Sequence, residues 1–286
     1  MSKLAHTLLF FIREQYHAQD IALVCACLGS LAKGGRAPVI IYNQGCLCNE
    51  QVHTLLGGYD LETHIIGSGE NTGTTVGRQA CFEYIWNTLP DIAYISELHP
   101  DMLFTPHWAD ILCAYLDANN EPMISSGIIN SGGVIPFSNR SAPLPSGGIT
   151  RDFLEELAED RIVHGFNNPC VHRAQALRAA GGYNPRFLTG KSCFEDDSML
   201  LGYLYYCGIQ SGWRPKVNLN AMVYHATAGQ RVGLGHNQLD NFNGLVRQYG
   251  AMGLLHLSEL HQSTWHQRFF SQQYESYANA SGMPTA

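Results

Sequence analysis

Ionisable side chains of the kind that bind metal ions gather directly after a buried apolar run. Glu97, His99 and Asp101 alternate just beyond residues 92–95, and alternate residues of an extended segment project to one side. Carboxylate oxygens and imidazole nitrogens are suitable ligands for Mn²⁺ or Mg²⁺, which keep open positions for phosphate oxygens. The spacing therefore predicts a divalent-cation site, with a solvated acidic loop as the alternative.

A second group of acidic residues, Glu195, Asp196 and Asp197, precedes a predicted helix over residues 198–207. Carboxylates in a first helical turn are favoured by the helix dipole, which explains at least one of them. Three in a row exceed what capping needs. A carboxylate held there beside a substrate hydroxyl can serve as a general base.

Two further polar positions end apolar strands. His225 closes the predicted strand over residues 220–225 and is either an ordinary strand-edge residue or a further ligand. Asn43 follows the β-branched run over residues 38–42 and opens an Asn-Gln-Gly turn. Turns at the carboxyl ends of strands are where open α/β sheets bind ligands.

The elements that position these residues alternate between strand and helix. Strands are predicted over residues 8–12, 38–42, 64–66 and 92–95, and helices over residues 20–31 and 75–87. This rhythm predicts an α/β fold with a doubly wound, mostly parallel sheet. A Gly-, Pro- and Ser-rich stretch over residues 131–150 is predicted to be a surface loop between two halves.

Composition excludes several classes of protein. The 286 residues carry 14% charged side chains and a net charge of −7, which argues against disorder, coiled coil and binding to nucleic acid. No apolar run approaches the length of a membrane span. The run over residues 8–12 is interrupted by Arg13 and Glu14, which indicates a strand rather than a signal peptide. We therefore expect a cytoplasmic protein.

The nine cysteines are an odd number in a chain of ordinary size, so we expect reduced and mostly buried thiols. The pairs Cys25/Cys27 and Cys46/Cys48 raise the alternative of a zinc module, but their spacing is shorter than structural zinc sites favour. The phosphate-binding loop of nucleotide triphosphatases and the nucleophile elbow of α/β hydrolases have no counterpart in the sequence.

The order of the motifs resembles that of family 2 glycosyltransferases with the GT-A fold over roughly residues 5–250. The family's Asp-x-Asp motif corresponds to His99-Pro100-Asp101, and its Gly-Gly-Phe-Asp phrase is similar to Gly181-Gly182-Tyr183-Asn184. Its Glu-Asp pair looks like Glu195-Asp196, and its Asn-x-Gly segment matches Asn71-Thr72-Gly73. His99 replaces the first Asp of the metal motif, and Asn43 replaces the Asp that reads the base.

The resemblance implies a metal-dependent transferase, of hexosyltransferase type, that moves a sugar from a nucleotide-diphosphate sugar to a carbohydrate or other hydroxyl-bearing acceptor with inversion. Asp196 is then the general base with Glu195 beside it, and His99, Asp101 and His225 hold Mn²⁺ or Mg²⁺. The residues expected to contact the nucleotide sugar are Asn43, Asn71, Gly73, Arg78, Glu97 and Lys191.

The resemblance also divides the chain. It implies one GT-A domain over residues 1–235, with a nucleotide-sugar half over 1–130 and an acceptor half over 131–235, followed by a helical extension over 236–286. A homo-oligomer is compatible with the sequence. The alternative is a catalytically inactive protein of the same fold that binds a nucleotide sugar or carbohydrate, because fold does not fix function.

Overall fold

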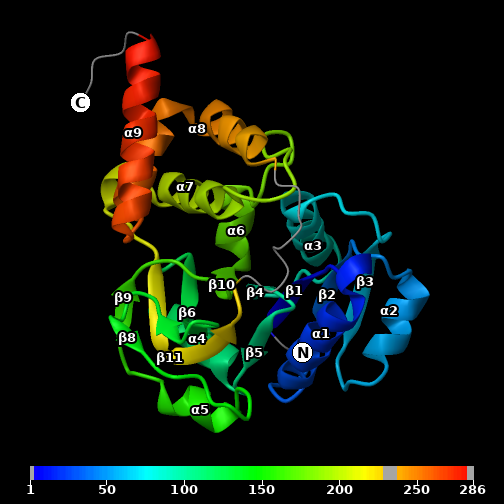
Figure 1. Cartoon of the computed structure of the whole chain (residues 1–286). Coiled ribbons are helices and arrows are strands. Elements are labelled where there is room, and N and C mark those ends of the chain that lie inside the picture. The colour runs from blue at the N-terminus through cyan, green and yellow to red at the C-terminus, as the bar shows by residue number, and fades with distance from the viewer. Residues whose placement is uncertain (1–2, 228–236, 282–286) are drawn as a thin grey trace.

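A computed structural model of the chain describes residues 3–227 and 237–281 (Figure 1). Its centre is a nine-stranded mixed sheet in the order β3-β2-β1-β4-β10-β6-β11-β5, with β9 paired to β11. The strands are β1 Leu4–Phe10, β2 Val39–Asn43, β3 Thr63–Gly67, β4 Tyr94–Leu98, β5 Met102–Phe104, β6 Met123–Asn130, β7 Val134–Ile135, β8 Arg140–Ser141, β9 Ile162–His164, β10 Cys170–Arg173 and β11 Lys216–His225. The helices are α1 His17–Leu31, α2 Asn49–Leu56, α3 Thr74–Thr88, α4 Trp108–Ala118, α5 Arg151–Glu156, α6 Ala174–Ala180, α7 Glu195–Cys207, α8 Gln238–Leu260 and α9 Thr264–Ser281.

The first half of the sheet is parallel, as the alternation of strands and helices predicted. Strands β3, β2, β1 and β4 all pair in parallel. The second half is mixed, because β10 runs antiparallel to both β4 and β6, and β5 runs antiparallel to β11. The carboxyl ends of β1 to β4 therefore meet at one edge, where α/β sheets bind ligands.

Two predicted strands are displaced along the sequence. Strand β1 begins at Leu4 rather than at residue 8, because the polar residues His6 and Thr7 are buried and satisfied by β4. The His6 Nδ1 atom lies 2.6 Å from Ser96 Oγ, and Thr7 Oγ1 donates to the Ser96 carbonyl over 2.8 Å. Strand β4 extends to Leu98, so Glu97 belongs to the strand and does not follow it.

The Gly- and Pro-rich stretch between the two halves contains a short hairpin. Strands β7 and β8 pair in antiparallel fashion, and Ile135 is buried in a small apolar cluster with Leu154 and Val217. The prediction of a surface loop is thus correct for most of this stretch, while the hairpin packs onto the sheet.

The two C-terminal helices share a core with the helices before them. Phe270 and Tyr274 on α9 belong to the same buried cluster as Leu200 and Leu201 on α7, and α7, α8 and α9 stack together on the side away from α2 (Figure 1). The predicted boundary at residues 235/236 lies outside the described residues. Among the described helices, none has the length and apolar character that crossing a membrane requires.

Candidate active site

Three candidate metal ligands meet where β5 pairs with the end of β11. The turn after β4 carries His99 and Asp101, and the antiparallel register sets His225 opposite Met102. One ligand atom from each of His99, Asp101 and His225 lies within 4.8 Å of the others. The His225 Nε2 atom is 3.4 Å from Asp101 Oδ1. The structure thus brings together the three residues for which the sequence predicted a metal site.

The surroundings of this group keep Asp101 ionised and His225 oriented. Burial raises the pKa of the Asp101 carboxyl, but the hydrogen bond from His225 and the nearby imidazoles of His225 and His99 lower that pKa below its ordinary value. His225 Nδ1 donates to the carbonyl of Asn168 over 3.1 Å. Since a carbonyl only accepts, Nδ1 carries a proton, and Nε2 is the ring nitrogen on the side of Asp101.

The donor set suits a first-row divalent cation. Two imidazoles and one ionised carboxylate fit Mn²⁺ and similar ions, whereas Mg²⁺ prefers oxygen ligands alone. The Asp101 and His225 side chains are 8% exposed, so an ion between them would be partly shielded from water. These residues therefore fit the cation that the resemblance implies.

Glu97 does not share a face with His99 and Asp101, and that expectation was wrong. Its carboxylate is buried and forms a second group with Cys170 and His172. It accepts from Tyr183 Oη over 2.9 Å and lies 2.9 Å from His172 Nε2. Burial alone would raise the pKa of the Glu97 carboxyl. His172, Arg78 and Tyr183 outweigh that effect and bring the pKa below its ordinary value, so Glu97 is a charged residue in the core.

Arg78 was expected to contact the nucleotide sugar, but its side chain is buried against strands β1 and β4. The side chain is buried and its Nε atom is 3.3 Å from Glu97 Oε2. Its terminal nitrogens donate to the carbonyls of Thr7 and Leu98. With its donors engaged in this way, Arg78 neutralises Glu97 and ties β1 to β4. Glu97 and Arg78 are therefore structural residues, because a carboxylate can be buried only with such partners.

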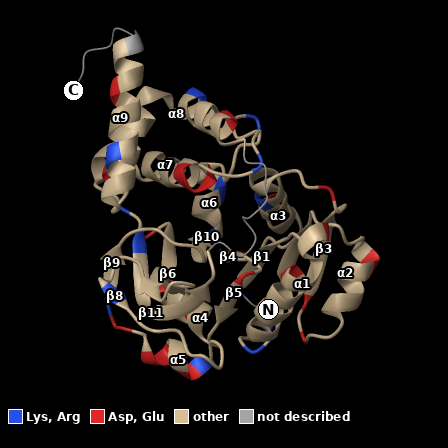
Figure 2. Ribbon diagram, in the orientation of Figure 1, with Lys and Arg blue, Asp and Glu red and all other residues tan. Residues whose placement is uncertain are grey.

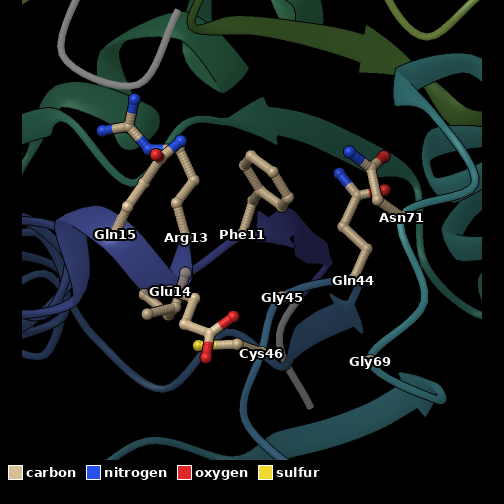
Figure 3. Close-up of a pocket in the computed structure, with 10 residues that line it drawn as sticks. Phe11, Arg13, Glu14, Gln15, Gln44, Gly45, Cys46, Gly69 and Asn71 are labelled. Carbon is tan, nitrogen blue, oxygen red and sulfur yellow. The ribbon is translucent and has the colours of Figure 1, made fainter. Parts of the chain in front are cut away.

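A cavity of 530 Å³ opens at the carboxyl ends of β1, β2 and β3 (Figure 3). The segments after all three strands line it, namely residues 11–15 after β1, 44–46 after β2, and Gly69 and Asn71 after β3. Figure 3 shows the amides of Gln44 and Asn71 on one side, Arg13 and Gln15 on the other, and the Phe11 ring between them. The cavity occupies the position that a nucleotide takes in open α/β sheets.

Gln44, rather than its neighbour Asn43, faces this cavity. The Asn43 amide is buried and donates to the Leu47 carbonyl over 2.9 Å and to Asn49 Oδ1 over 2.8 Å, so it shapes the loop. Gln44 is 6% exposed, and within the described residues its Oε1 atom has no hydrogen-bond partner. The sequence offered one signal for Gln44, its place at the end of the same strand.

Three other residues predicted to contact the donor meet between two loops. Lys191 Nζ donates to the carbonyl of Asn71, and Asn71 Oδ1 accepts from the Gly73 amide over 3.0 Å. Gly73 has a φ of 95°, and a Cβ atom there would lie 3.1 Å from Lys191 Cα. The structure thus brings Asn71, Gly73 and Lys191 together, and Asn71 also reaches the cavity.

The predicted general base lies in the first turn of α7. Asp196 Oδ1 accepts from Asn168 Nδ2 over 3.2 Å, and Ser192 Oγ donates to Glu195 over 3.4 Å. Asp197 is held by His261 of the C-terminal helices, whose Nε2 atom is 2.7 Å away. Asn168 therefore connects the candidate base to the candidate metal ligand His225.

The cysteines give no support to a zinc module. Within residues 3–227 and 237–281, the two groups of possible metal ligands are those already described, and neither contains a Cys-x-Cys pair. The nine cysteines all lie within the described residues, and none of them forms a disulfide bond. Cys46 and Cys48 are exposed, contrary to the expectation of mostly buried thiols, whereas Cys27, Cys81 and Cys170 are buried as expected.

Lys and Arg are dispersed among Asp and Glu rather than gathered on one face (Figure 2).

The sheet order and its flanking helices constitute the GT-A fold that the motif order predicted. No family model matches the sequence, and no curated protein is significantly similar to it. Among solved structures, residues 1–349 of TarS from S. aureus share 11% identity at a TM-score of 0.58, over 98% of this chain and 72% of that one. The same TarS segment in complex with UDP-GlcNAc gives 12% identity, a TM-score of 0.58, and coverage of 97% and 72%. A longer TarS structure gives 14% identity and a TM-score of 0.55 over 97% of this chain and 43% of that chain.

Proposed function

We propose that this protein is a metal-dependent glycosyltransferase that moves a sugar from a nucleotide-diphosphate sugar to an acceptor hydroxyl. One observation carries the proposal. On a GT-A fold, His99, Asp101 and His225 form a compact ligand group, and Asn168 connects that group to the carboxylate of Asp196. A cation site beside a candidate base is the combination that glycosyl transfer from a diphosphate requires.

The cavity at the carboxyl ends of β1, β2 and β3 is the proposed nucleoside site. Phe11, Gln44 and Asn71 line it, so the cavity presents an aromatic side chain and two side-chain amides to a base. UDP-GlcNAc bound to TarS gives a donor of this class to test first.

His99, Asp101 and His225 are the residues that would hold Mn²⁺ or Mg²⁺. When bound, such a cation neutralises the negative charge that grows on the leaving diphosphate, which is often the largest catalytic contribution. Asn71 lines the cavity and Lys191 donates to the Asn71 carbonyl, so both would contact the donor. Arg78 and Glu97 would not contact the donor; their buried ion pair stabilises the end of β4, the strand that precedes His99 and Asp101.

Asp196 is the proposed general base. It takes the proton of the acceptor hydroxyl as the acceptor oxygen forms a bond to the anomeric carbon. The bond from that carbon to the diphosphate oxygen breaks, and its electron pair leaves with the nucleoside diphosphate. Attack from the face opposite the leaving group inverts the anomeric centre. Glu195 lies beside the base in the first turn of α7 and adds to the negative potential there.

The second candidate is an inactive protein of the same fold that binds a nucleotide sugar. The substitution of His99 for a carboxylate in the metal motif is the observation that favours it. The two candidates differ in turnover and not in binding. Release of UDP from UDP-GlcNAc, with water in place of the acceptor, would exclude the inactive alternative.

Thermal unfolding of the full chain with nucleotides tests the binding that both candidates share. We expect UDP and UDP-GlcNAc to raise the melting temperature more with Mn²⁺ than with EDTA, because a ligand that binds only the folded state stabilises it. GDP and ADP serve as controls for the base. If no nucleotide shifts the melting temperature with or without Mn²⁺, the proposed function is wrong.

A further inference from the structure

Asn168 contacts three parts of the site at once. It lies just before β10, and its side-chain nitrogen donates to Asp196 Oδ1 over 3.2 Å. Its side-chain oxygen accepts from the Cys170 thiol over 3.4 Å. Its backbone carbonyl accepts from His225 Nδ1 over 3.1 Å. The candidate base and one candidate metal ligand are thus held by the same residue.

The thiol of Cys170 fixes which end of the Asn168 amide faces Asp196. Cys170 is buried, and burial together with the charges of Glu97 and Asp196 raises the pKa of its thiol well above the ordinary value. The thiol therefore stays protonated and donates. His172 Nε2 lies 3.1 Å from the sulfur but is also 2.9 Å from Glu97 Oε1, to which it can donate. Of the two oxygens near the thiol, that of Asn168 is closer than Glu97 Oε1, which is 4.0 Å away. With the amide oxygen accepting from Cys170, the amide nitrogen must face Asp196.

We infer that Asn168 is a positioning residue that holds the base Asp196 through its side chain and the ligand His225 through its backbone. The inference rests on the proposed function. Its side-chain nitrogen donates to Oδ1 of Asp196 and so fixes the orientation of that carboxylate. Its carbonyl accepts from His225 Nδ1, which orients the ring with Nε2 on the side of Asp101. Partners of this kind orient the groups that do the chemistry.

The two roles can be separated by substitution. Asn168→Ala removes the amide but keeps the backbone carbonyl, so we expect Asp196 to lose its orientation while His225 keeps its own. The kcat for hydrolysis of UDP-GlcNAc should fall about 10- to 100-fold. The KM for UDP-GlcNAc and the affinity for Mn²⁺, measured by electron paramagnetic resonance, should stay within about 2-fold. Cys170→Ala should lower kcat less, because the amide keeps its contact with Asp196.

Asn168→Asp provides a second, nearly isosteric variant in case the alanine variant does not fold. A carboxylate in place of the amide still accepts from Cys170 but sets a like charge against Asp196, which raises the pKa of Asp196. The acid limb of the kcat profile should therefore move to higher pH. The groups facing Asp196 from other elements, Cys170 and Tyr183, have raised pKa values and remain neutral at the pH of the assay.

The control is Asn220→Ala, an exposed asparagine on β11, which should behave as the wild type. Two results would overturn the inference: wild-type kcat in Asn168→Ala together with an unmoved pH profile in Asn168→Asp, or an equal loss of kcat and Mn²⁺ affinity in Asn168→Ala. A wild-type protein that binds neither UDP nor Mn²⁺ would instead overturn the proposed function, and the inference with it.

Discussion

Asp101 and His99 make different contributions to the ligand group. Asp101 is buried, and its carboxylate lies 3.4 Å from His225 Nε2. His99 is only partly buried, and its ring meets that of His225 edge to face, with centroids 5.1 Å apart. Asp101 supplies the negative charge that attracts a cation. His99 supplies a neutral lone pair that a carboxylate can replace.

Substitution of the two residues should therefore have opposite outcomes. We expect Asp101→Ala to lose metal-dependent binding of UDP, by at least about 10-fold, because the ligand group is left with imidazoles alone. His99→Asp should retain that binding. Calorimetric titration of UDP with and without Mn²⁺ measures both, with His164→Asp on the exposed part of β9 as the control. Unchanged binding of UDP and Mn²⁺ by Asp101→Ala would place the metal elsewhere.

Adjacent carboxylates in α7 allow a matched comparison of the base. Asp196→Asn should reduce sugar transfer or donor hydrolysis by about 100-fold or more while leaving the affinity for UDP nearly unchanged, because a general base acts on the acceptor proton. Asp197→Asn should keep most activity, since that carboxylate is engaged by His261. Steady-state kinetics and UDP titration test the pair. Equal kinetics for both variants would move the base to another residue.

At the scale of single elements, strand β1 carries a buried histidine that makes the sheet sensitive to acid. Burial lowers the pKa of His6 to about 4. The ring is nearly parallel to Trp108 of α4, with centroids 6.0 Å apart, and bonds to Ser96 of β4. Between pH 4 and pH 6.5 the unfolded chain therefore binds a proton at this position that the folded chain does not.

The free energy of unfolding should consequently fall as the pH drops from 6.5 toward 4, by up to about 3 kcal/mol from this residue. The contribution is fully present above pH 6.5. Urea unfolding at pH 7 and pH 4.5 measures the effect, and His6→Gln, which can still bond to Ser96, should show a smaller difference between the two pH values. An identical difference in both proteins would show that His6 titrates normally.

At the scale of the whole molecule, the C-terminal helices support the element that carries the base. Phe194 directly precedes α7 with a φ of 62°, and its ring packs against Phe242 of α8 and Phe269 and Phe270 of α9. These contacts hold the start of α7, where Asp196 lies. The helices α8 and α9 therefore complete the core around the site and do not merely follow it.

Truncation of one aromatic side chain in α9 should therefore destabilise the entire protein. Phe270 is 1% exposed, and Phe270→Ala should lower the free energy of unfolding by about 3–5 kcal/mol. Trp265 lies on the same helix and is 65% exposed. Trp265→Ala should therefore lower the free energy of unfolding by less than about 1 kcal/mol. Denaturant unfolding followed by circular dichroism compares them. Similar losses for the two variants would mean that α9 does not share the core.

Local sequence patterns are enough to predict the parallel half of the sheet and the polar groups at its carboxyl edge. Apolar runs such as Val39–Asn43 specify buried strands locally, and a turn after such a strand must lie at the sheet edge. The spacing of Glu97, His99 and Asp101 predicted a cation site, and the motif order implied the GT-A fold with His225 as a further ligand.

Tertiary structure decided which polar residues face ligand and which serve the core. Glu97 is buried because Arg78, His172 and Tyr183, each distant in sequence, converge on its carboxylate. Likewise Gln44 rather than Asn43 faces the cavity, because the Asn43 amide donates a hydrogen bond to Asn49 Oδ1 at the start of α2. Asn168 reaches both Asp196 and His225 because β10 is inserted antiparallel between β4 and β6. The local sequence shows whether a residue is polar. Its partners, however, are set by the pairing of strands that are far apart in the sequence, and these partners determine its role.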